Sequence, residues 1–431
     1  MNVEELKAVV ADQREEVGRA LREERIIDRE ALERWREWIE SDMIKVVMGA
    51  RRSGKSIFSL QLLRGKSHAY VNFDDERLVD LDASQLNLLF EALLQVYGDF
   101  KFILLDEVQN VHGWELFVSR LRRQGFNLVI TGSNAKLLSK ELATHLTGRH
   151  IPIEIFPFSF REFLEFDGLV TERKAAYSTR EKAVLMGKLQ EYIQGGGFPE
   201  AVRIKDAVKA RMYLQTLYST VVTKDVISRH RIRFLKTIRE ISNYLVSNFS
   251  QPVSFNKVKN VFGLQSVHTS KNYVSYLEET YLIFLIEKYS RKRKESLNSP
   301  KKVYCIDCGM INAVGFRSSE NLGRLMENAV AVELLRRRSE DPSLELYYWR
   351  DYQQREVDFV LKGGEAVREL LQVTYSSGRD EVEKREVAAL TRAGRELGVD
   401  KLTVVTWDHE GVEVAEGREV RFVPLWKWLR G

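Results

Sequence analysis

The chain has 431 residues, which is enough for about three domains at roughly 150 residues each. Hydrophobic residues make up 44% and charged residues 30%, and no apolar run approaches the ~18 residues that span a bilayer, so no membrane partner is expected. Lys plus Arg exceed Asp plus Glu by 67 to 62, and a net charge of +5 is too small for a non-specific polyanion binder. The acidic first residues lack the features of a secretory signal, so we expect a cytoplasmic protein.

Residues 1–42 are expected to be helical, and a phosphate loop follows them. Between an apolar strand at 44–48 and an amphipathic helix at 57–63, the chain matches the pattern G-x-x-x-x-G-K-[ST]. Its glycines allow successive backbone N–H groups to wrap a phosphate at the start of a helix. The expected nucleotide-binding residues are Gly49, Ala50, Arg51, Arg52, Ser53, Gly54, Lys55, Ser56 and Ile57.

Two residues of this loop have more specific expected roles. Lys55 supplies charge to the β- and γ-phosphates and takes part in catalysis, while the hydroxyl of Ser56 is a ligand for Mg²⁺. The alternative is a strand-to-helix turn that binds nothing. The complete context of strand, loop and helix disfavours that alternative.

A second strand, at 102–105, ends in two carboxylates. Four apolar residues before Asp106 and Glu107 describe a buried strand that delivers charge at the sheet edge where α/β proteins bind ligands, a Walker B element. Asp106 would hold Mg²⁺ together with Ser56, and Glu107 would be the catalytic group that orients or deprotonates the attacking water. The alternative, a pair that only caps the next helix, is disfavoured by the upstream phosphate loop.

Two further positions follow the strand expected at 127–131. Ser133 or Asn134 could sense the γ-phosphate, and a plain turn with a helix cap is an equal alternative. A helix is expected at 135–146, after which Arg149 precedes a strand at 151–156. From there Arg149 could reach a nucleotide on a neighbouring subunit, or it could be a surface or helix-capping arginine.

The combined motifs resemble the AAA+ ATPases of archaea and bacteria, particularly members with a winged helix and a restriction-endonuclease-like C-terminal domain. The resemblance rests on the phosphate loop and on residues 104–109, 131–133, 146–149 and 157–163. It implies an α/β fold in which a P-loop parallel sheet is followed by a helical lid, a winged helix-turn-helix and an α/β nuclease-like domain. It also implies ATP or ADP with Mg²⁺ as cofactors. On this resemblance Arg149 is a catalytic arginine finger acting in trans in a homo-oligomer.

The resemblance and the pattern of the chain predict five segments. They are N-terminal helices at 1–42, the ATPase core at 43–165, the lid at 166–230, the winged helix at 231–318 and the nuclease-like domain at 319–431. Within the lid, the run Gly-Gly-Gly-Phe-Pro at 195–199 breaks a helix sharply. It is either a hinge or a packing turn, and the packing turn is favoured because glycine clusters commonly mark turns between elements.

Three helical patterns at 234–249, 254–262 and 269–279 precede a strand at 281–289, the order of a winged helix-turn-helix. Polar side chains at the start of the third helix could reach phosphates or base edges. A positive run then falls at the expected wing, with Lys301 and Lys302 after it. DNA is therefore a candidate partner, and a solvated loop or a protein-docking module is the alternative. The expected DNA contacts are Lys271, Arg291, Lys292, Arg293 and Lys294.

Cys305 and Cys308 form a lone C-x-x-C. A zinc site needs four ligands, and no second pair with suitable spacing is visible in the sequence. We therefore expect reduced, partly buried thiols.

The last segment has a pattern similar to a PD-(D/E)xK nuclease core. Glu327 matches the acid of its helix and Asp358 the acid of its first strand, but Gln372 and Thr374 stand where the second strand should carry E-x-K. A neutral amide is a poor substitute for a Mg²⁺-binding carboxylate, and threonine lacks the positive charge that activates water. We therefore expect a structural or DNA-holding domain.

The leading interpretation is an ATP-hydrolysing AAA+ protein that couples its nucleotide state to DNA or partner binding. A nucleotide-gated DNA-binding regulator with negligible turnover is the second interpretation. A Mg²⁺-dependent DNA nuclease is the third, and the missing ligands disfavour it.

Overall fold

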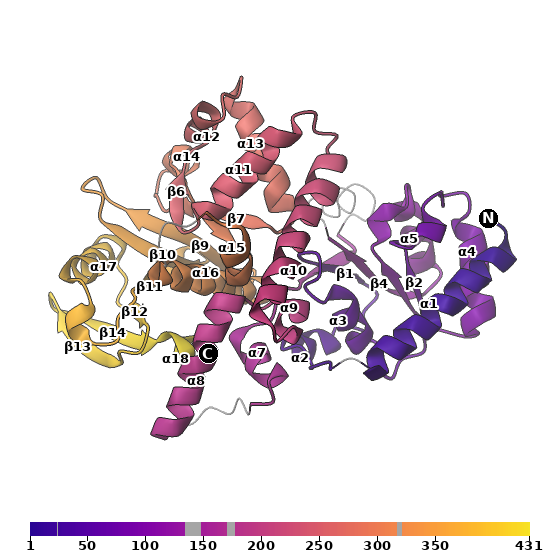
Figure 1. Cartoon of the computed structure of the whole chain (residues 1–431), viewed down its shortest axis with the longest axis horizontal. Coiled ribbons are helices and arrows are strands. Elements are labelled where there is room, and N and C mark those ends of the chain that lie inside the picture. Colours follow the sequence, from indigo (N-terminus) through magenta and orange to yellow (C-terminus); the bar gives the residue numbers. More distant parts are fainter. Residues whose placement is uncertain (24, 134–147, 170–176, 317–320) are drawn as a thin grey trace. The chain divides into compact units, whose positions relative to one another are not determined.

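A computed structural model describes residues 1–23, 25–133, 148–169, 177–316 and 321–431 (Figure 1). The chain forms two compact units, Met1–Phe156 and Pro157–Gly431. The N-terminal helices thus belong to the same unit as the phosphate loop, while the boundaries expected inside the second unit stay predictions. The helix expected at 135–146 lies outside the described residues.

The first unit contains a sheet of five parallel strands in the order β2-β3-β4-β1-β5. The strands are β1 (Ile44–Met48), β2 (His68–Asn72), β3 (Phe102–Asp106), β4 (Asn127–Gly132) and β5 (His150–Glu154). Every residue of β1, β3 and β4 is buried, as expected for parallel strands covered on both faces. Because β1 lies between β4 and β5 while the chain next enters β2 at the far edge, the carboxyl end of β1 is a point where ligands bind in such sheets.

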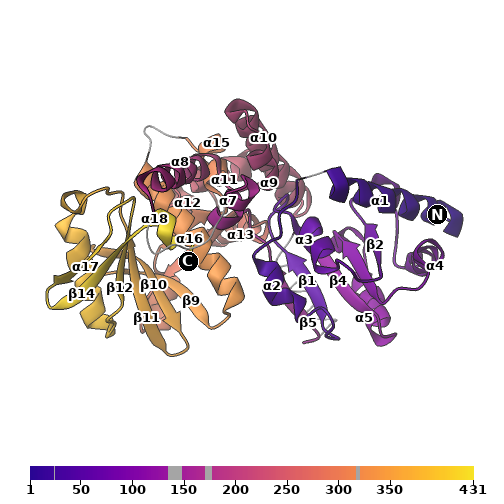
Figure 2. The ribbon, with the colours of Figure 1, turned by 90° about the horizontal axis from the view of Figure 1, so that it is seen from below.

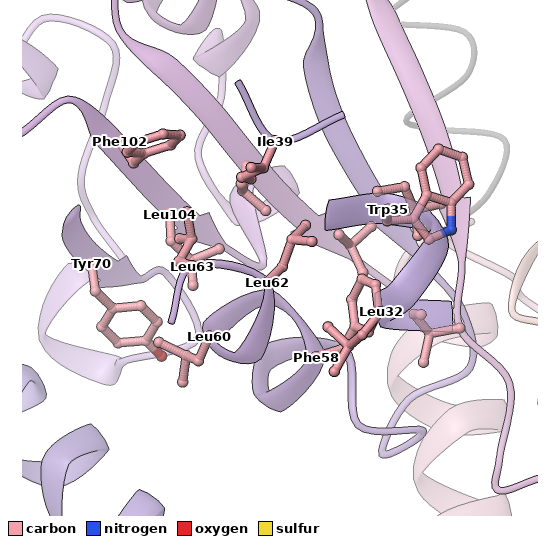
Figure 3. Packing of buried hydrophobic residues seen from close by; sticks show 14 residues of the cluster. Leu32, Trp35, Ile39, Phe58, Leu60, Leu62, Leu63, Tyr70, Phe102 and Leu104 are labelled. Carbon is pink, nitrogen blue, oxygen red and sulfur yellow. The ribbon is translucent and has the colours of Figure 1, made fainter. Parts of the chain in front are cut away.

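The helices of this unit pack on the sheet and on one another. They are α1 (Val3–Glu23), α2 (Ala31–Arg36), α3 (Lys55–Leu62), α4 (Leu86–Tyr97) and α5 (Trp114–Arg123), with short 3₁₀ turns at Glu76–Leu78 and Val108–Asn110. Helix α1 lies against α4 and β2. Figure 3 shows the core around α3, in which Trp35 of α2 and Phe58 of α3 pack in one cluster with Phe102 and Leu104 of β3.

The second unit begins with helices. They are α7 (Phe160–Phe166), α8 (Thr179–Gly195), α9 (Pro199–Arg203) and α10 (Ala207–Thr220), and α10 continues into a π-helical stretch at Val221–Ser228. Capping boxes start α7 and α8, in which Ser159 pairs with Glu162 and Ser178 with Glu181.

Three helices and three antiparallel strands follow in the segment predicted as a winged helix. They are α11 (Leu235–Ser247), β6 (Gln251–Val253), α12 (Phe255–Val261), α13 (Val267–Glu279), β7 (Ile283–Lys288) and β8 (Lys301–Cys305). A short helix, α14 (Arg293–Asn298), occupies the expected wing. Arg293 and Lys294 are therefore helical, where the sequence analysis placed a wing, with a solvated loop as the alternative.

The rest of the chain adds six strands and four helices to the described structure. They are α15 (Cys308–Val314), α16 (Leu322–Glu340), β9 (Leu344–Arg350), β10 (Glu356–Gly363), β11 (Ala366–Val373), α17 (Lys384–Leu397), β12 (Leu402–Thr406), β13 (Gly411–Ala415), β14 (Arg418–Pro424) and α18 (Leu425–Trp428). The sequence patterns predicted α16, α17 and β9 to β12, and they missed the final hairpin.

The described strands of the second unit join one nine-stranded sheet, in the order β13-β14-β12-β11-β10-β9-β7-β8-β6. Figure 2 shows part of this sheet, from β14 to β9. The link is a parallel pairing of β7 with β9, in which Glu287 aligns with Tyr347 and Lys288 with Tyr348. The predicted winged-helix and nuclease-like segments therefore share one hydrogen-bonded sheet.

The glycine run of the predicted lid is a site of close packing. Gly196 ends α8 with φ +79°, and the backbone N–H of Gly197 donates to the carboxylate of Asp307 at 2.6 Å. A Cβ at Gly196 would lie 2.1 Å from an oxygen of Asp307, and one at Gly197 would lie 2.4 Å from the carbonyl oxygen of Phe158. These contacts favour the packing turn over the hinge.

Both cysteines are free and buried, more deeply than predicted. Burial raises the pKa of Cys305 to about 12, so its thiol is protonated at neutral pH. None of the described helices combines the length and the hydropathy that a membrane span requires.

Candidate active site

The phosphate loop leaves the carboxyl end of β1 and enters α3 through two glycines. Gly49 has φ +149° and Gly54 has φ +95°. A Cβ at Gly49 would lie 2.0 Å from the carbonyl oxygen of Ile155, so the neighbouring chain leaves no room for a larger residue. The sequence pattern and the backbone thus agree on where glycine is required.

Lys55 begins α3 and its ammonium points into the loop. Its Nζ donates to the carbonyl oxygen of Ala50 at 3.2 Å and lies 3.6 Å from Oε1 of Glu107. The side chain is only 4% exposed. The structure therefore brings the lysine of the loop next to the carboxylate that directly follows β3.

Asp106 ends β3 and is almost completely buried. Its carboxylate accepts hydrogen bonds from the hydroxyls of Ser56, Thr131 and Tyr70, the last at 3.2 Å. Burial, together with the charge of Glu107, raises the pKa of Asp106. A buried carboxylate in contact with the Ser56 hydroxyl is the donor pair that a hard divalent cation prefers, and a cation there would favour the ionised form of Asp106.

Glu107 has a left-handed backbone, with φ +52°. Its N–H donates to the hydroxyl of Thr131 at 3.0 Å, and its carboxylate accepts a hydrogen bond from the amide of Gln109 at 2.5 Å. Burial opposes its charge, but the ammonium of Lys55 and the amide of Gln109 outweigh burial and lower the pKa of Glu107. Glu107 is therefore ionised at neutral pH.

The remaining predicted site residues differ in their burial and in their partners. Ser133, just after β4, is 1% exposed, and its hydroxyl has no hydrogen-bond partner among the described residues. Arg51 pairs with Asp74 at 3.5 Å, and Arg52 is exposed with φ +66°. Ile57 is half-buried in the first turn of α3. Asn134, the alternative to Ser133, lies outside the described residues.

Arg149 precedes β5 and its side chain is exposed. Its carbonyl oxygen accepts a hydrogen bond from the N–H of Ile44 at 3.0 Å, at the start of β1. Strands β1 and β5 are parallel, so this contact lies at the amino end of β1, whereas the phosphate loop leaves the carboxyl end. Within a single chain the structure does not bring Arg149 to the loop.

Three residues that the sequence patterns missed hold the site in place. Arg29, which is 7% exposed, donates to the carbonyl oxygen of Ser53 at 2.9 Å and to that of Phe156 at 2.7 Å. Thr131 contacts both Asp106 and Glu107, and Tyr70 reaches Asp106 from β2. Thr131 carried a signal, since it ends the strand next to β3, but nothing in the sequence singled out Arg29 or Tyr70.

The predicted DNA contacts are all exposed, and two of them have partners within the chain. Arg293 pairs with Glu287 at 2.6 Å, and Arg291 donates to the carbonyl oxygen of Glu396 at 3.2 Å. Lys271 lies on α13 with its ammonium 5.7 Å from the ring centre of Phe255. Lys302, by contrast, is 1% exposed, so the prediction that it adds to a basic wing surface is wrong.

Known proteins extend this picture to the whole chain. An AAA domain model matches residues 41–164, and two domain models of unknown function, DUF8612 and DUF4143, match residues 186–321 and 322–428. Uncharacterized protein MJ1544 of Methanocaldococcus jannaschii is 38% identical over 398 residues, which cover 89% of this chain and 88% of that protein. The chain belongs to the family of that uncharacterized protein, and its residues 41–164 form the part that matches an AAA domain.

More distant matches point the same way only in part. An uncharacterized protein of Haemophilus influenzae is 32% identical to this AAA family member over 69% of the chain and 76% of the relative. Among solved structures, the Walker-type ATPase PABY2304 of Pyrococcus abyssi is 14% identical, with a TM-score of 0.44 over 67% of this chain and 96% of that one. That structural likeness is too loose to bear on function. The AAA domain confirms the expected ATPase class for the N-terminal part of the chain.

Proposed function

We propose that this AAA family member binds ATP with Mg²⁺ at the phosphate loop and hydrolyses it. The observation that carries the proposal is the meeting of two pairs at one sheet edge, Ser56 with Asp106 and Lys55 with Glu107. Ser56 and Asp106 would hold Mg²⁺, which neutralises charge on the phosphates. Gly54 and its neighbours would cradle the phosphates with backbone N–H groups.

Glu107 is the proposed catalytic base. It is ionised because its pKa is lowered, and its left-handed backbone is held by Thr131. A bound nucleotide would draw the ammonium of Lys55 towards the β- and γ-phosphates and leave Glu107 to orient the attacking water. The hydroxyl of Ser133 is buried and has no hydrogen-bond partner within the described ranges of the chain, which supports its proposed contact with the γ-phosphate.

The decisive measurement is ATP turnover against protein concentration. Turnover that requires Mg²⁺ and disappears on chelation supports the Ser56 and Asp106 assignment. A rate per chain that rises with concentration supports the proposed homo-oligomer and a role in trans for Arg149, and loss of that rise in Arg149→Ala links the two. A chain that binds ATP without measurable turnover would contradict the hydrolysis proposal.

We further propose that the second unit binds DNA or a partner protein. The order α11-β6-α12-α13-β7-β8 with antiparallel strands supports a winged helix, and α13 would be its recognition helix. Lys271, on α13, and the run from Arg291 to Lys294 are exposed and basic. Binding through them should weaken steeply with salt.

A second candidate function is a nucleotide-gated DNA-binding regulator with negligible turnover. The observation that favours it is the double engagement of Glu107, by Lys55 and by Gln109, which would leave the base unavailable if it persisted with ATP bound. DNA affinity that differs between ADP and a non-hydrolysable ATP analogue, with background turnover, would support this candidate. DNA affinity that is the same with both nucleotides would contradict it.

A further inference from the structure

Lys302, in β8, lies at the centre of a cluster of three carboxylates. Its Nζ is 2.9 Å from Oε1 of Glu327, 2.7 Å from Oε1 of Glu356 and 2.8 Å from Oδ1 of Asp358. The lysine side chain is 1% exposed. The ammonium donates hydrogen bonds to Glu327 and Asp358, and its contact with Glu356 is an ion pair. The acids come from α16 and β10, which the lysine of β8 thereby joins.

The other donors around the cluster are also engaged. The hydroxyl of Tyr304 donates to Oε1 of Glu327 at 2.7 Å, and the N–H of Val373 donates to Oδ2 of Asp358 at 2.9 Å. Gln372, which replaces the acid of the nuclease pattern, accepts a hydrogen bond from the N–H of Asp358 at 3.3 Å. The side-chain oxygen of Gln372 is thus engaged by a backbone N–H.

The charge of Lys302 is stable in this setting. Burial alone would favour the neutral amine, but Asp358 and Glu327 outweigh burial and raise the pKa of Lys302. Two of the three surrounding acids, Glu327 and Asp358, are those that match the acid positions of a PD-(D/E)xK pattern. No group of three or more His, Cys, Asp or Glu side chains in the described part of the chain is arranged to hold a metal ion.

We propose that the ammonium of Lys302 takes the place of a divalent cation at this acidic centre, and that removing it opens a site for such a cation. Oxygen ligands approach Mg²⁺ to about 2.1 Å and Ca²⁺ to about 2.3–2.6 Å, and they bind ammonium at hydrogen-bond distances. The observed separations of 2.7 to 2.9 Å are those of an ammonium centre. The buried ammonium of Lys302 thus holds β8 to α16 and β10 through ion pairs. This centre shares no residue with the ATPase site.

The test uses Mn²⁺ as the probe and the nucleotide-free full chain. Lys302→Ala removes the ammonium and leaves room for a cation. The matched control is Lys301→Ala, because Lys301 is the preceding residue of β8 and its ammonium pairs with Glu287, at 2.7 Å, which lies outside the cluster. A third variant combines Lys302→Ala with Asp358→Asn. Electron paramagnetic resonance counts bound Mn²⁺, and any binding at the phosphate loop is common to all four proteins.

The expected result is one additional Mn²⁺ per chain in Lys302→Ala, absent from the wild type, from Lys301→Ala and from the combined variant. Mn²⁺ should also raise the Tm of Lys302→Ala more than that of the wild type, because a ligand stabilises the state it binds. A folded Lys302→Ala that binds no more Mn²⁺ than the wild type would overturn the proposal.

Two further outcomes keep the test decisive. If Lys302→Ala does not fold in metal-free buffer, it is refolded in the presence of Mn²⁺. Recovery of the folded state supports the replacement of the ammonium by a cation, and failure to refold contradicts it. Asp358→Asn in the wild-type background examines the other half of the proposal. If that substitution abolishes Mn²⁺ binding by the wild-type chain, Lys302 does not exclude the cation and the proposal fails.

Discussion

The guanidinium of Arg29 donates a hydrogen bond to the carbonyl oxygen of Ser53, inside the phosphate loop, at 2.9 Å. Arg29 also holds the carbonyl oxygen of Phe156, so one buried side chain fixes the loop against the chain that follows β5. With the Ser53 carbonyl turned towards Arg29, this interaction helps to fix the backbone orientation that phosphate binding requires. Arg29 acts through the loop and is a positioning residue.

Arg29→Ala should destabilise the first unit and weaken ATP binding together. Hydrogen bonds to a charged group contribute about 1.5–3 kcal/mol, and two carbonyl oxygens would lose a buried donor. Urea denaturation and titration with a non-hydrolysable ATP analogue measure the two effects. Arg36→Ala is the control, since Arg36 is exposed and pairs with Asp28 at 3.5 Å. Equal ATP affinity in both variants would show that Arg29 does not position the phosphate loop for ATP binding.

Glu107→Gln should retain ATP binding and lose turnover. Glutamine keeps the size of the side chain but cannot accept the proton of water, and general-base catalysis contributes about 10²–10⁴-fold. Steady-state ATPase rates and analogue affinity separate the two properties. Glu91→Gln on α4, where Glu91 is exposed and bonds Gln95, should behave like the wild type. Wild-type turnover in Glu107→Gln would disprove the assignment of the base.

Lys55→Ala should lose affinity for ATP as well as turnover. A charged hydrogen bond to phosphate contributes about 1.5–3 kcal/mol, which corresponds to a loss of about 10- to 100-fold in affinity. Lys66→Ala, just beyond α3, removes a lysine that pairs with Glu40 and serves as the control. If Lys55→Ala kept both affinity and turnover, the phosphate loop would not be the nucleotide site.

The free energy of unfolding should fall as the pH rises through the pKa of Asp307. Burial raises the pKa of this carboxyl from 3.8 to about 6, despite hydrogen bonds from backbone N–H groups. The folded chain therefore binds more protons than the unfolded chain between these values, and this group's contribution is lost across that window. The expected loss is about 3 kcal/mol.

Asp307→Asn isolates that contribution, because asparagine can still accept from Gly197 but does not titrate. Denaturation of both proteins between pH values of about 4 and about 7 gives the difference, in which contributions from other acids cancel. Glu327 and Glu386 have pKa values raised to about 7 by burial and shift stability in both proteins alike. A difference that does not change with pH would contradict the prediction.

Gly309→Ala should destabilise the second unit, whereas Gly187→Ala should stabilise it. A Cβ at Gly309 would lie 2.0 Å from the carbonyl oxygen of Gly195, and one at Gly187 would meet nothing within 4 Å. Overpacking costs about 1–3 kcal/mol, while replacing an exposed helical glycine by alanine adds about 0.5–1 kcal/mol. Thermal denaturation distinguishes the signs, and equal Tm shifts in the two variants would contradict the proposed close packing.

The sequence allowed much of the first unit to be predicted, because its signals are local. The phosphate loop and the carboxylates at the end of β3 depend on short motifs next to strong apolar strands, and the helix expected at 57–63 overlaps α3. The positions of Arg29 and Tyr70 depend on contacts between residues far apart in the chain, and such contacts leave no periodic pattern. The same reason explains Lys302, which looked like part of a basic surface run because its acidic partners are 25 and 56 residues away.

The hairpin of β13 and β14 was missed for a different reason. In β13 the residues Gly411, Glu413 and Ala415 alternate with Val412 and Val414, and both valines are exposed, so no apolar face marks β13 as part of a core. Its pairing with β14 supplies the order that the pattern does not.

The pairing of β7 with β9 has a consequence for how this protein can be divided. The two domain models of unknown function meet between residues 321 and 322, yet the strands on either side of that boundary are hydrogen-bonded neighbours. A fragment beginning at residue 322 would expose the open edge of β9, and one ending at residue 321 would expose that of β7. Unpaired edges recruit other chains, so each fragment alone should aggregate. The two models therefore describe parts of one inseparable folding unit, which gene fusion or recombination would have to transfer whole.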